Sequence, residues 1–437
     1  ARQAPLEYDK TPKEDQNMSR NEALYQMSTW IEIVSKNMSQ LSKPQAKLLA
    51  MYSFGMVLTS RSGRTSVAAV LAELLNEEEA NIDSRLRDWY CEAAAKPGYD
   101  AERQVGRDQV DVGTCFEPWL RWILSHWQDR VLPLALDATM LRDRFIVLSI
   151  SLVYRGNAIP IAWKILPGNQ SHPWEPEWER LLTLLQPAVP PSMLVLVLTD
   201  RGLYSRSLFR KIQEFHWHPF MRIKNGGSFR PQEQNCRPLA TFAARRGQFW
   251  CGAGTAFQRV SRQQPATLLA FWAQEAKEPW LILTDLPPDQ AEICWYALRF
   301  WIEPSFRTIK RGGLLWHHTK MTDPERAERL WLPMALAMFW FMSAGTPRDE
   351  LQITTPAFST DLPTTEALPP NLPATGLPMR QTLTQRQPLP TRPVRKLSVT
   401  RRGWFHTLVS LVSGHAVQFS DLIFGPLPSI TGIFAPY

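Results

Sequence analysis

The stretch that most constrains the fold runs from Met193 to Asp200 and reads Met-Leu-Val-Leu-Val-Leu-Thr-Asp. A short apolar run without polar alternation is typical of a central strand that is buried on both faces of a sheet. Leu132–Thr139 is a second short apolar run, and it carries Asp137 near its end. Two such strands side by side would present Asp137 and Asp200 at one edge of the sheet.

The segments around these two strands complete an α/β pattern. Phe145–Tyr154 and Ala158–Leu166 predict a β-hairpin. Helices are expected at Glu177–Leu185 and Ser205–His216, and a further strand at His218–Lys224. The order strand, hairpin, helix, strand, helix, strand predicts a mixed sheet of the α/β class.

A helix is expected from Tyr296 to Lys310, where the composition favours helix and glycine is absent. Five residues recur at steps of three and four and would share one helical face: Tyr296, Arg299, Glu303, Arg307 and Lys310. Cations one turn away on either side would keep Glu303 ionised and leave positive charge for an anion. The alternative is a solvated face with ordinary ion pairs. Because Pro304 follows Glu303, we expect a kink that can take Lys310 off this face.

Three carboxylates, Asp137, Asp200 and Glu303, are the candidate chemical groups. Hard oxygen ligands suit Mg²⁺ or Mn²⁺, and two ions roughly 4 Å apart can assist phosphodiester chemistry. Histidine or cysteine at metal-ligand spacing does not accompany them, which argues against a zinc site or a nucleophilic thiol. His317 and His318 are expected at the surface or on phosphate.

Charge and length point to a polyanionic partner and more than one domain. The chain has 437 residues and a net charge of +8, and a basic field of this kind attracts nucleic acid. The five cysteines are scattered without a C-x-x-C pair, which favours reduced thiols in the cytosol. Leu330–Gly345 is short for a membrane span and contains Pro333, so we expect a buried helix that begins near Thr322.

Composition suggests seven segments. We expect a disordered lead-in at 1–20, a helical DNA-binding domain at 21–127, a catalytic core at 128–225 and 287–346, a β-rich insertion at 226–286, a proline-rich basic linker at 347–403 and a small C-terminal element at 404–437. Within the helical part, Ser66–Asn76 and Asp83–Ala94 have the build of a helix-turn-helix, with Arg61, Arg64, Arg85 and Arg87 nearby. A plain helical hairpin is equally compatible with this pattern.

At the carboxylates the chain resembles a known family. Asp137, the turn Thr199-Asp200-Arg201-Gly202 and the pattern Tyr296-x2-Arg299-x3-Glu303-x6-Lys310 look like the DDE transposases of bacterial insertion sequences, in the group with the Y-R-E-K signature. The resemblance covers about residues 20 to 345. It implies a ribonuclease-H-like core with a β insertion, an N-terminal helical DNA-binding domain, Mg²⁺ (Mn²⁺ as substitute, two ions) and cut-and-paste transposition through a DNA hairpin.

The resemblance also implies partners and contacts. Trp280 matches the tryptophan that stacks on a flipped base, with a core tryptophan as the alternative. The expected DNA contacts are Tyr296, Arg299, Arg307, Lys310, Trp280, Arg201, Arg222, Lys224, Arg85 and Arg87. The expected partners are double-stranded terminal inverted repeats and target DNA, with a homodimer in the synaptic complex, no membrane, and a place on the nucleoid in the bacterial cytoplasm.

Two other functions remain open from the sequence. One is a silenced relic that is retained as a DNA-binding protein, against which the intact Asp137, Asp200 and Glu303 argue. The other is a carboxylate-pair glycosidase that uses the 18 tryptophans as sugar platforms. The arginines and the lysine around Glu303 suit phosphate better than a neutral sugar.

Overall fold

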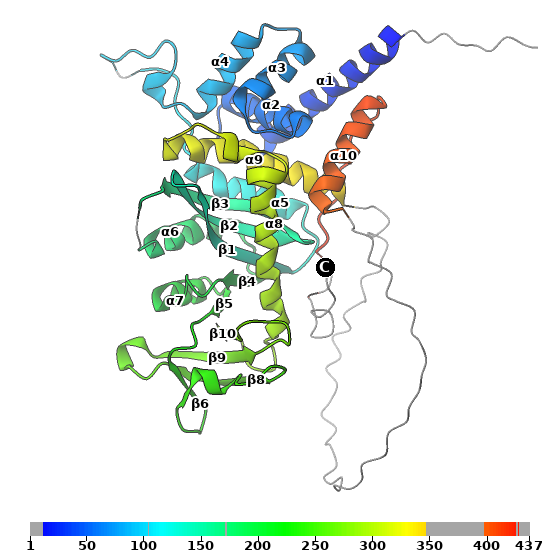
Figure 1. The fold of residues 1–437 in the computed structure, drawn as a ribbon. Coiled ribbons are helices and arrows are strands. Elements are labelled where there is room, and N and C mark those ends of the chain that lie inside the picture. Colours follow the sequence, from blue (N-terminus) through cyan, green and yellow to red (C-terminus); the bar gives the residue numbers. More distant parts are fainter. Residues whose placement is uncertain (1–11, 104, 171–172, 347–396, 425–426, 428–437) are drawn as a thin grey trace, which may run out of the picture. The chain divides into compact units, whose positions relative to one another are not determined.

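One mixed sheet of ten strands organises the part of the chain described by the computed structural model (Figure 1), which is residues 12–103, 105–170, 173–346, 397–424 and 427. The strand order is β3-β2-β1-β4-β5-β10-β9-β8-β6-β7. The strands are β1 (Val131–Leu141), β2 (Phe145–Tyr154), β3 (Asn157–Pro167), β4 (Leu194–Thr199), β5 (His218–Arg222), β6 (Ser228–Pro231), β7 (Arg237–Pro238), β8 (Phe249–Ala256), β9 (Gln264–Phe271) and β10 (Trp280–Thr284). The predicted α/β class is confirmed.

The parallel pair β1 and β4 lies inside the sheet, as the third and fourth strands in its order. All ten residues of β2 are buried, and in β4 every residue after Leu194 is buried, as expected for strands covered on both faces. β1 runs antiparallel to β2 and parallel to β4, with Leu136 opposite Thr199. The next residues along the two strands are Asp137 and Asp200, so the register brings both carboxylates to the same place.

The β-rich insertion joins the core sheet directly. β10 pairs antiparallel with β5 of the core and with β9, and β9 pairs with β8. The strands of the insertion are therefore hydrogen-bonded to the core strands in one continuous sheet. β7 is the outermost strand on that side. This continuity places Trp280, the first residue of β10, beside the carboxyl end of β5.

Helices precede the sheet and cover it. Five helices precede the first strand along the chain: α1 (Pro12–Asn37), α2 (Lys43–Thr59), α3 (Arg64–Leu75), α4 (Glu79–Tyr90) and α5 (Phe116–Ser125). Two more lie between strands in the sequence, α6 (Glu175–Leu185) and α7 (Arg206–Glu214). The Ser42 side chain accepts from Gln45 N in a capping box that starts α2. Because α1 begins at Pro12, residues 12–20 of the expected disordered lead-in are helical, and the rest of that segment lies outside the described residues.

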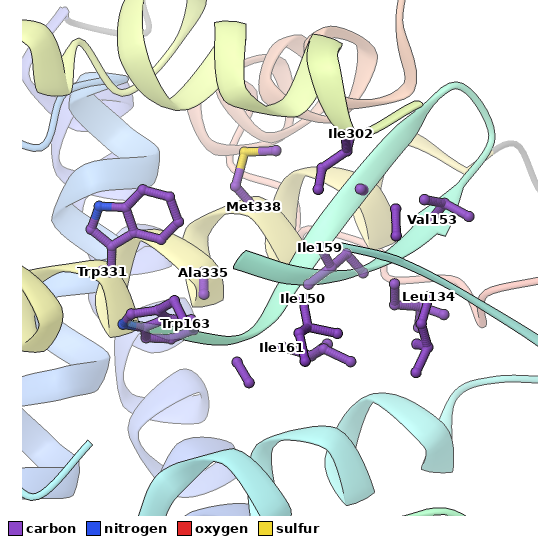
Figure 2. Packing of buried hydrophobic residues seen from close by; sticks show 14 of the residues in the cluster. Leu134, Ile150, Val153, Ile159, Ile161, Trp163, Ile302, Trp331, Ala335 and Met338 are labelled. Carbon is purple, nitrogen blue, oxygen red and sulfur yellow. The ribbon is translucent and has the colours of Figure 1, made fainter. Parts of the chain in front are cut away.

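The last long helix, α9 (Pro324–Gly345), is buried along most of its length. Asp323 caps it by accepting from Arg326 N at 2.9 Å, and Pro324 takes the first turn, as the sequence predicts. Figure 2 shows Trp331 and Met338 of this helix packed among residues of β2 and β3, with the Trp331 and Trp163 rings 6.0 Å apart. None of the described helices combines the length and the apolarity needed to cross a membrane.

A helix after the proline-rich segment, α10 (Val399–Val412), crosses α9 at two glycines. A Cβ at Gly403 would lie 1.8 Å from Phe341 O, and one at Gly345 would lie 1.9 Å from Val399 O, so the crossing requires both glycines. Residues 399–403, which were expected in the linker, are therefore helical. Residues 347–396 of that expected linker lie outside the described part of the chain.

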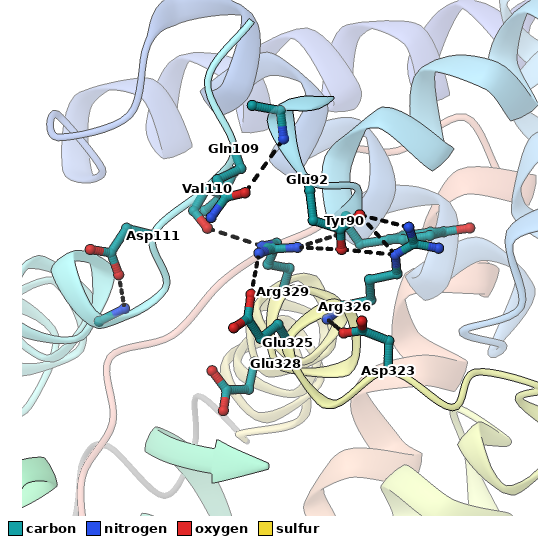
Figure 3. A network of polar contacts seen from close by, with 12 residues as sticks. Tyr90, Glu92, Gln109, Val110, Asp111, Asp323, Glu325, Arg326, Glu328 and Arg329 are labelled. Atoms are coloured by element: carbon teal, nitrogen blue, oxygen red, sulfur yellow. Dashed lines mark hydrogen bonds and ion pairs between the residues drawn. The ribbon is translucent and has the colours of Figure 1, made fainter. Parts of the chain in front are cut away.

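A polar network joins α9 to the N-terminal helices (Figure 3). Arg326 donates two hydrogen bonds to Glu92 at 2.9 and 2.6 Å, and the pKa of Glu92 falls to about 2 chiefly because of that partner. Arg329 is buried and donates to Tyr90 O at 2.8 Å and Val110 O at 3.2 Å. A buried guanidinium needs such a full set of acceptors, so these contacts fix α9 against the segment after α4.

Replacing Glu92 by glutamine should lower the free energy of unfolding by about 2 kcal/mol at pH 7, because the charge-assisted bonds from Arg326 and Arg329 are lost. The folded-state pKa of Glu92 lies below its ordinary value of 4.5, so its contribution is complete above 4.5 and is lost as the pH falls toward 2. Urea unfolding at several pH values should therefore show the two proteins converging in acid.

Glu117→Gln provides the control, since Glu117 pairs with Arg121 at 2.8 Å on a more exposed surface. Its effect should stay within about 0.5 kcal/mol at each pH. A Glu92→Gln deficit that does not change between neutral and acidic pH would contradict the assigned role of the carboxylate charge.

Candidate active site

The segment that carries Glu303 is not the continuous α-helix that its composition predicts. It is a 3₁₀ helix from Ile293 to Trp301, then α8 (Ile302–Arg307), then a π-helical turn from Thr308 to Gly312. Pro304 explains the break. It lies in the first turn of α8, where an N–H has no partner within the helix, so the α-helix can begin at Ile302 and not earlier.

The prediction that Tyr296, Arg299, Glu303, Arg307 and Lys310 share one helical face is therefore wrong. Tyr296 and Arg299 point into the protein and are buried, whereas Glu303 and Arg307 are exposed. Lys310 leaves the row, and its Nζ donates to Thr139 Oγ1 at 2.7 Å and to Met140 O at 3.3 Å on β1. The irregular turns still bring the basic residues of this segment to β1, where Asp137 lies.

Arg299 stands between two of the three carboxylates. Its Nη2 lies 3.0 Å from Asp137 Oδ2, and its Nη1 lies 3.3 Å from Glu303 Oε1. Asp137 Oδ1 also accepts from the backbone N–H of Ala138 at 3.0 Å. One buried cation thus joins the strand that carries Asp137 to the helix that carries Glu303.

The strand register places Asp200 next to Asp137, and its charge acts on the pKa of Asp137. Burial raises this pKa, the charge of Arg299 and the Ala138 hydrogen bond oppose the rise, and the negative charges of Asp200 and Glu303 add to it. The same three carboxylates raise the pKa of Arg299 against the opposing effect of its burial. Like charges gathered in this way require a cation between them.

A hard divalent cation fits this set of donors. The groups are carboxylate oxygens, which Mg²⁺ and Mn²⁺ prefer. Among the described residues no three histidine, cysteine, aspartate or glutamate side chains already enclose a position for an ion, and Arg299 is the cation that separates Asp137 from Glu303. Asp137, Asp200 and Glu303 could hold a metal if the guanidinium moves aside.

A cavity of about 520 Å³ opens between the end of β1 and the Glu303 segment. Basic side chains dominate its polar lining, which would suit a phosphate backbone. Sequence reasoning missed two of them: Arg142, in the turn after β1, and Arg311, whose only signal was its place next to Lys310. Its charged lining consists of Asp137, Arg142, Glu303, Arg307, Lys310, Arg311 and His317.

Trp280 lies at the edge of this region in an aromatic group. Its ring meets Tyr296 edge-on at 5.2 Å and lies nearly parallel to Phe300 at 5.9 Å. The Trp280 side chain is partly exposed and Phe300 is exposed. Phe300 did not emerge from the sequence, because its position next to Arg299 carries no pattern of its own.

Arg201 and Arg222, two more of the expected DNA-contacting residues, both lie close to Glu278. Arg201 pairs with Glu278, and Arg222 Nη2 lies 3.6 Å from the same carboxylate and donates to Pro279 O at 3.3 Å. Lys224 is exposed two residues after β5. Arg201 and Arg222 are therefore held by an acidic neighbour, and Lys224 is the more available cation.

The helices α3 and α4 form the pair that the sequence predicted, with Asn76 in the left-handed conformation at the end of α3. On α4, Arg85 pairs with Glu77, and Arg87 is exposed and forms no ion pair with the described residues. Arg64 is less available than expected, because Asp83 and the Tyr90 hydroxyl hold it at 2.8 and 3.0 Å.

The loop before α3 also touches the catalytic part. Ser62 N donates to Leu314 O at 2.7 Å, and Ser60 Oγ donates to Gly313 O at 3.2 Å. Leu314 follows the π-helical turn that contains Lys310. The helical part and the Glu303 segment are thus directly connected.

One family model matches a large part of this chain. The family model of the transposase DDE domain matches residues 148–340, which include Asp200 and Glu303. Residues 148–340 form a transposase DDE domain. Asp137 lies just before the matched range, on the strand that pairs with β2 and β4.

The other comparisons add little. A solved piggyBac transposase synaptic complex with hairpin DNA is similar at a TM-score of 0.36 and 11% identity, over 78% of either chain. A likeness this low carries no argument about the function of this chain. A search of curated proteins finds no match.

Replacing Arg299 by glutamine tests whether the guanidinium occupies the place of a metal. Without metal, the variant should lose about 3 kcal/mol of stability, because Asp137 keeps a largely buried charge with no cation beside it. Added Mn²⁺ should raise the melting temperature of Arg299→Gln more than that of the unchanged chain. Thermal unfolding in EDTA and in Mn²⁺ measures both effects.

The double variant Arg299→Gln/Asp137→Asn is the matched control and should gain much less from Mn²⁺, since one ligand is gone. Equal Mn²⁺ shifts in the unchanged chain and in Arg299→Gln would show that the guanidinium does not compete with the ion.

Proposed function

We propose that this chain performs metal-dependent cut-and-paste transposition of an insertion sequence through a hairpin intermediate. The observation that supports the proposal is that buried Arg299 contacts both Asp137 and Glu303, while the strand register places Asp200 next to Asp137. The strand order β3-β2-β1-β4-β5, with β1, β4 and β5 parallel, supports a ribonuclease-H-like core. The domain boundaries expected from the sequence are part of this proposal.

Asp137, Asp200 and Glu303 would hold Mg²⁺, or Mn²⁺ in its place. When bound, two such ions activate an oxygen nucleophile and stabilise the leaving oxygen of a phosphodiester. The protein's own part is to position the DNA. Lys310 is hydrogen-bonded to Thr139 on β1, and Arg307 is exposed at the end of α8. Both line the cavity and can bind phosphate groups there.

In the reaction we propose, hydrolysis at the transposon end releases a 3′-hydroxyl. That hydroxyl attacks a phosphodiester of the opposite strand, forms the hairpin bond and releases the 3′-hydroxyl of the flanking DNA. Water then hydrolyses the hairpin bond, and the regenerated 3′-hydroxyl attacks a target phosphodiester and releases a target 3′-hydroxyl. The bent hairpin needs one base outside the stack. Trp280 is partly exposed beside Tyr296 and Phe300 and offers an aromatic face for that base.

The helical part would recognise the terminal inverted repeats. α3 and α4 have helix-turn-helix connectivity, and the exposed Arg87 lies on the second helix, which enters the major groove in such readers. We further propose a homodimer in the synaptic complex, because two ends must be cut together. The assembled carboxylates and the basic cavity favour an active enzyme over a silenced DNA-binding relic.

Changing Asp137 or Asp200 to asparagine, or Glu303 to glutamine, should reduce cleavage of a terminal duplex by a similar large factor, about 10³-fold or more, because the three groups act as a unit. Binding of the same duplex should persist, since removing a negative charge does not weaken phosphate contacts. Gel assays of cleavage and of binding with Mg²⁺ and with EDTA separate the two effects.

Asp143→Asn is a suitable control, because Asp143 is an exposed carboxylate in the turn after β1. It should cut normally. A Glu303→Gln protein that cuts with Mg²⁺ at the normal rate would refute the assignment of Glu303.

Trp280→Ala should leave first-strand nicking near normal and lower hairpin product about ten- to a hundredfold, as expected for the loss of about 1 to 3 kcal/mol of base stacking. Trp280→Phe should recover part of the product. Quantified nicked and hairpin DNA on denaturing gels gives both yields. Trp272→Ala is the control, because Trp272 donates to Ala276 O at 3.0 Å within its own turn. Equal loss of nicking and hairpin in Trp280→Ala would identify Trp280 as a structural residue.

A further inference from the structure

The turn between β8 and β9 projects an unusual group of side chains: Arg259, Val260, Ser261 and Arg262. Val260 is 81% exposed, the largest exposed fraction among the large apolar side chains described. Arg259 and Arg262 are also exposed, and neither forms an ion pair with the described residues. Arg262 N donates to Arg259 O at 2.7 Å, so the turn has a defined shape although its side chains point to solvent.

Contacts with the start of α7 hold this turn in place. Arg206 Nη1 donates to Ser261 O at 2.6 Å, and the ring of Tyr204 lies 5.5 Å from that of Phe257. Phe257 has a φ of +68°, a strained backbone conformation for a side chain of this size. Strain of this kind persists only where the surroundings enforce it, and the contacts with Arg206 and Tyr204 provide that support.

The adjoining face of α7 adds further positive charge. Arg206, Arg210 and Lys211 line a cavity of about 480 Å³, together with Glu179 and Glu214. Glu214 is engaged by Lys211 at 3.1 Å. Arg210 is exposed and has no ion pair among the described residues. We call Arg206, Arg210, Lys211, Arg259, Val260 and Arg262 the α7–turn surface.

We propose that the α7–turn surface binds the sugar-phosphate backbone of duplex DNA outside the transposon end. Exposed arginines without acidic partners are available for phosphates, and an apolar tip between two arginines fits against a groove. The inference rests on the proposed function only in taking DNA as the partner. None of these residues belongs to the site described above.

The position of this surface along the chain supports the assignment. Asp200 O accepts from Leu203 N at 3.0 Å, and Tyr204 and Arg206 follow at once. The polypeptide thus passes from a candidate catalytic aspartate directly into the α7–turn surface. Donor DNA that flanks the end and target DNA share the same backbone chemistry, and either could be the duplex bound here.

The test uses the full chain with Arg210, Arg259 and Arg262 all changed to glutamine. With terminal duplexes that carry flanking DNA, the variant should bind about ten- to a hundredfold more weakly at low salt, and the slope of log K against log[salt] should become shallower by about three, one unit for each lost phosphate contact. Duplexes that end at the cleavage site should bind as they do to the unchanged chain.

Strand transfer of a pre-cleaved end into plasmid distinguishes the source of the duplex. If the triple variant binds flanked duplexes weakly but transfers strands normally, the surface binds flanking donor DNA. If it binds flanked duplexes normally but loses strand transfer, the surface binds target DNA. A triple variant that is normal in both assays overturns the proposal. That result is expected if the natural partner of this surface is an acidic protein.

Arg130→Gln/Arg246→Gln/Lys320→Gln is the matched control, because it removes three exposed cations that form no ion pair with the described residues and lie outside both the helical part and the α7–turn surface. Equal weakening by both triple variants would mean that net charge, not this surface, is responsible, and would also overturn the proposal. If the unchanged chain fails to cut terminal DNA, the proposed function fails, while the comparison of flanked and unflanked duplexes still decides the role of this surface.

Discussion

The parallel pairing of β1 with β4 is the constraint on which the rest of the site depends. It places Leu136 opposite Thr199, and so it places Asp137 and Asp200 side by side at the point where β4 ends. The interiors of both strands are buried, so a slip of one residue toward the sheet interior would bury a carboxylate among apolar side chains. Hydrophobic burial thus fixes the position of the two acids without any contact between them.

Arg299 offsets the repulsion between the three carboxylates. A largely buried Asp137 beside two other carboxylates is unfavourable, and its raised pKa reflects that cost. The guanidinium offsets it by contacting both Asp137 and Glu303. The same residue therefore stabilises the protein without metal, and a metal held by these carboxylates would have to compete with it.

Two connections make the helical part and the catalytic part a single unit. Glu92, Arg326 and Arg329 hold α9 against the segment after α4, and Ser60 and Ser62 bond to the chain just beyond Lys310. The contacts place all described residues from 12 to 346 in one compact unit together with α10. DNA bound by α4 would therefore be held in a fixed relation to Glu303.

The sequence by itself determined the α/β class, the strands that carry Asp137 and Asp200, and the domain family, because apolar runs and spaced charged residues are local patterns. It also predicted a kink at Pro304, but not the 3₁₀ and π-helical turns on either side of α8, which composition does not reveal. The tertiary structure alone decided the contacts of Arg299, the hydrogen bonds of Lys310 to β1 and the contact between Arg206 of α7 and Ser261 of the turn. Each of these depends on residues distant in sequence, which only packing brings together.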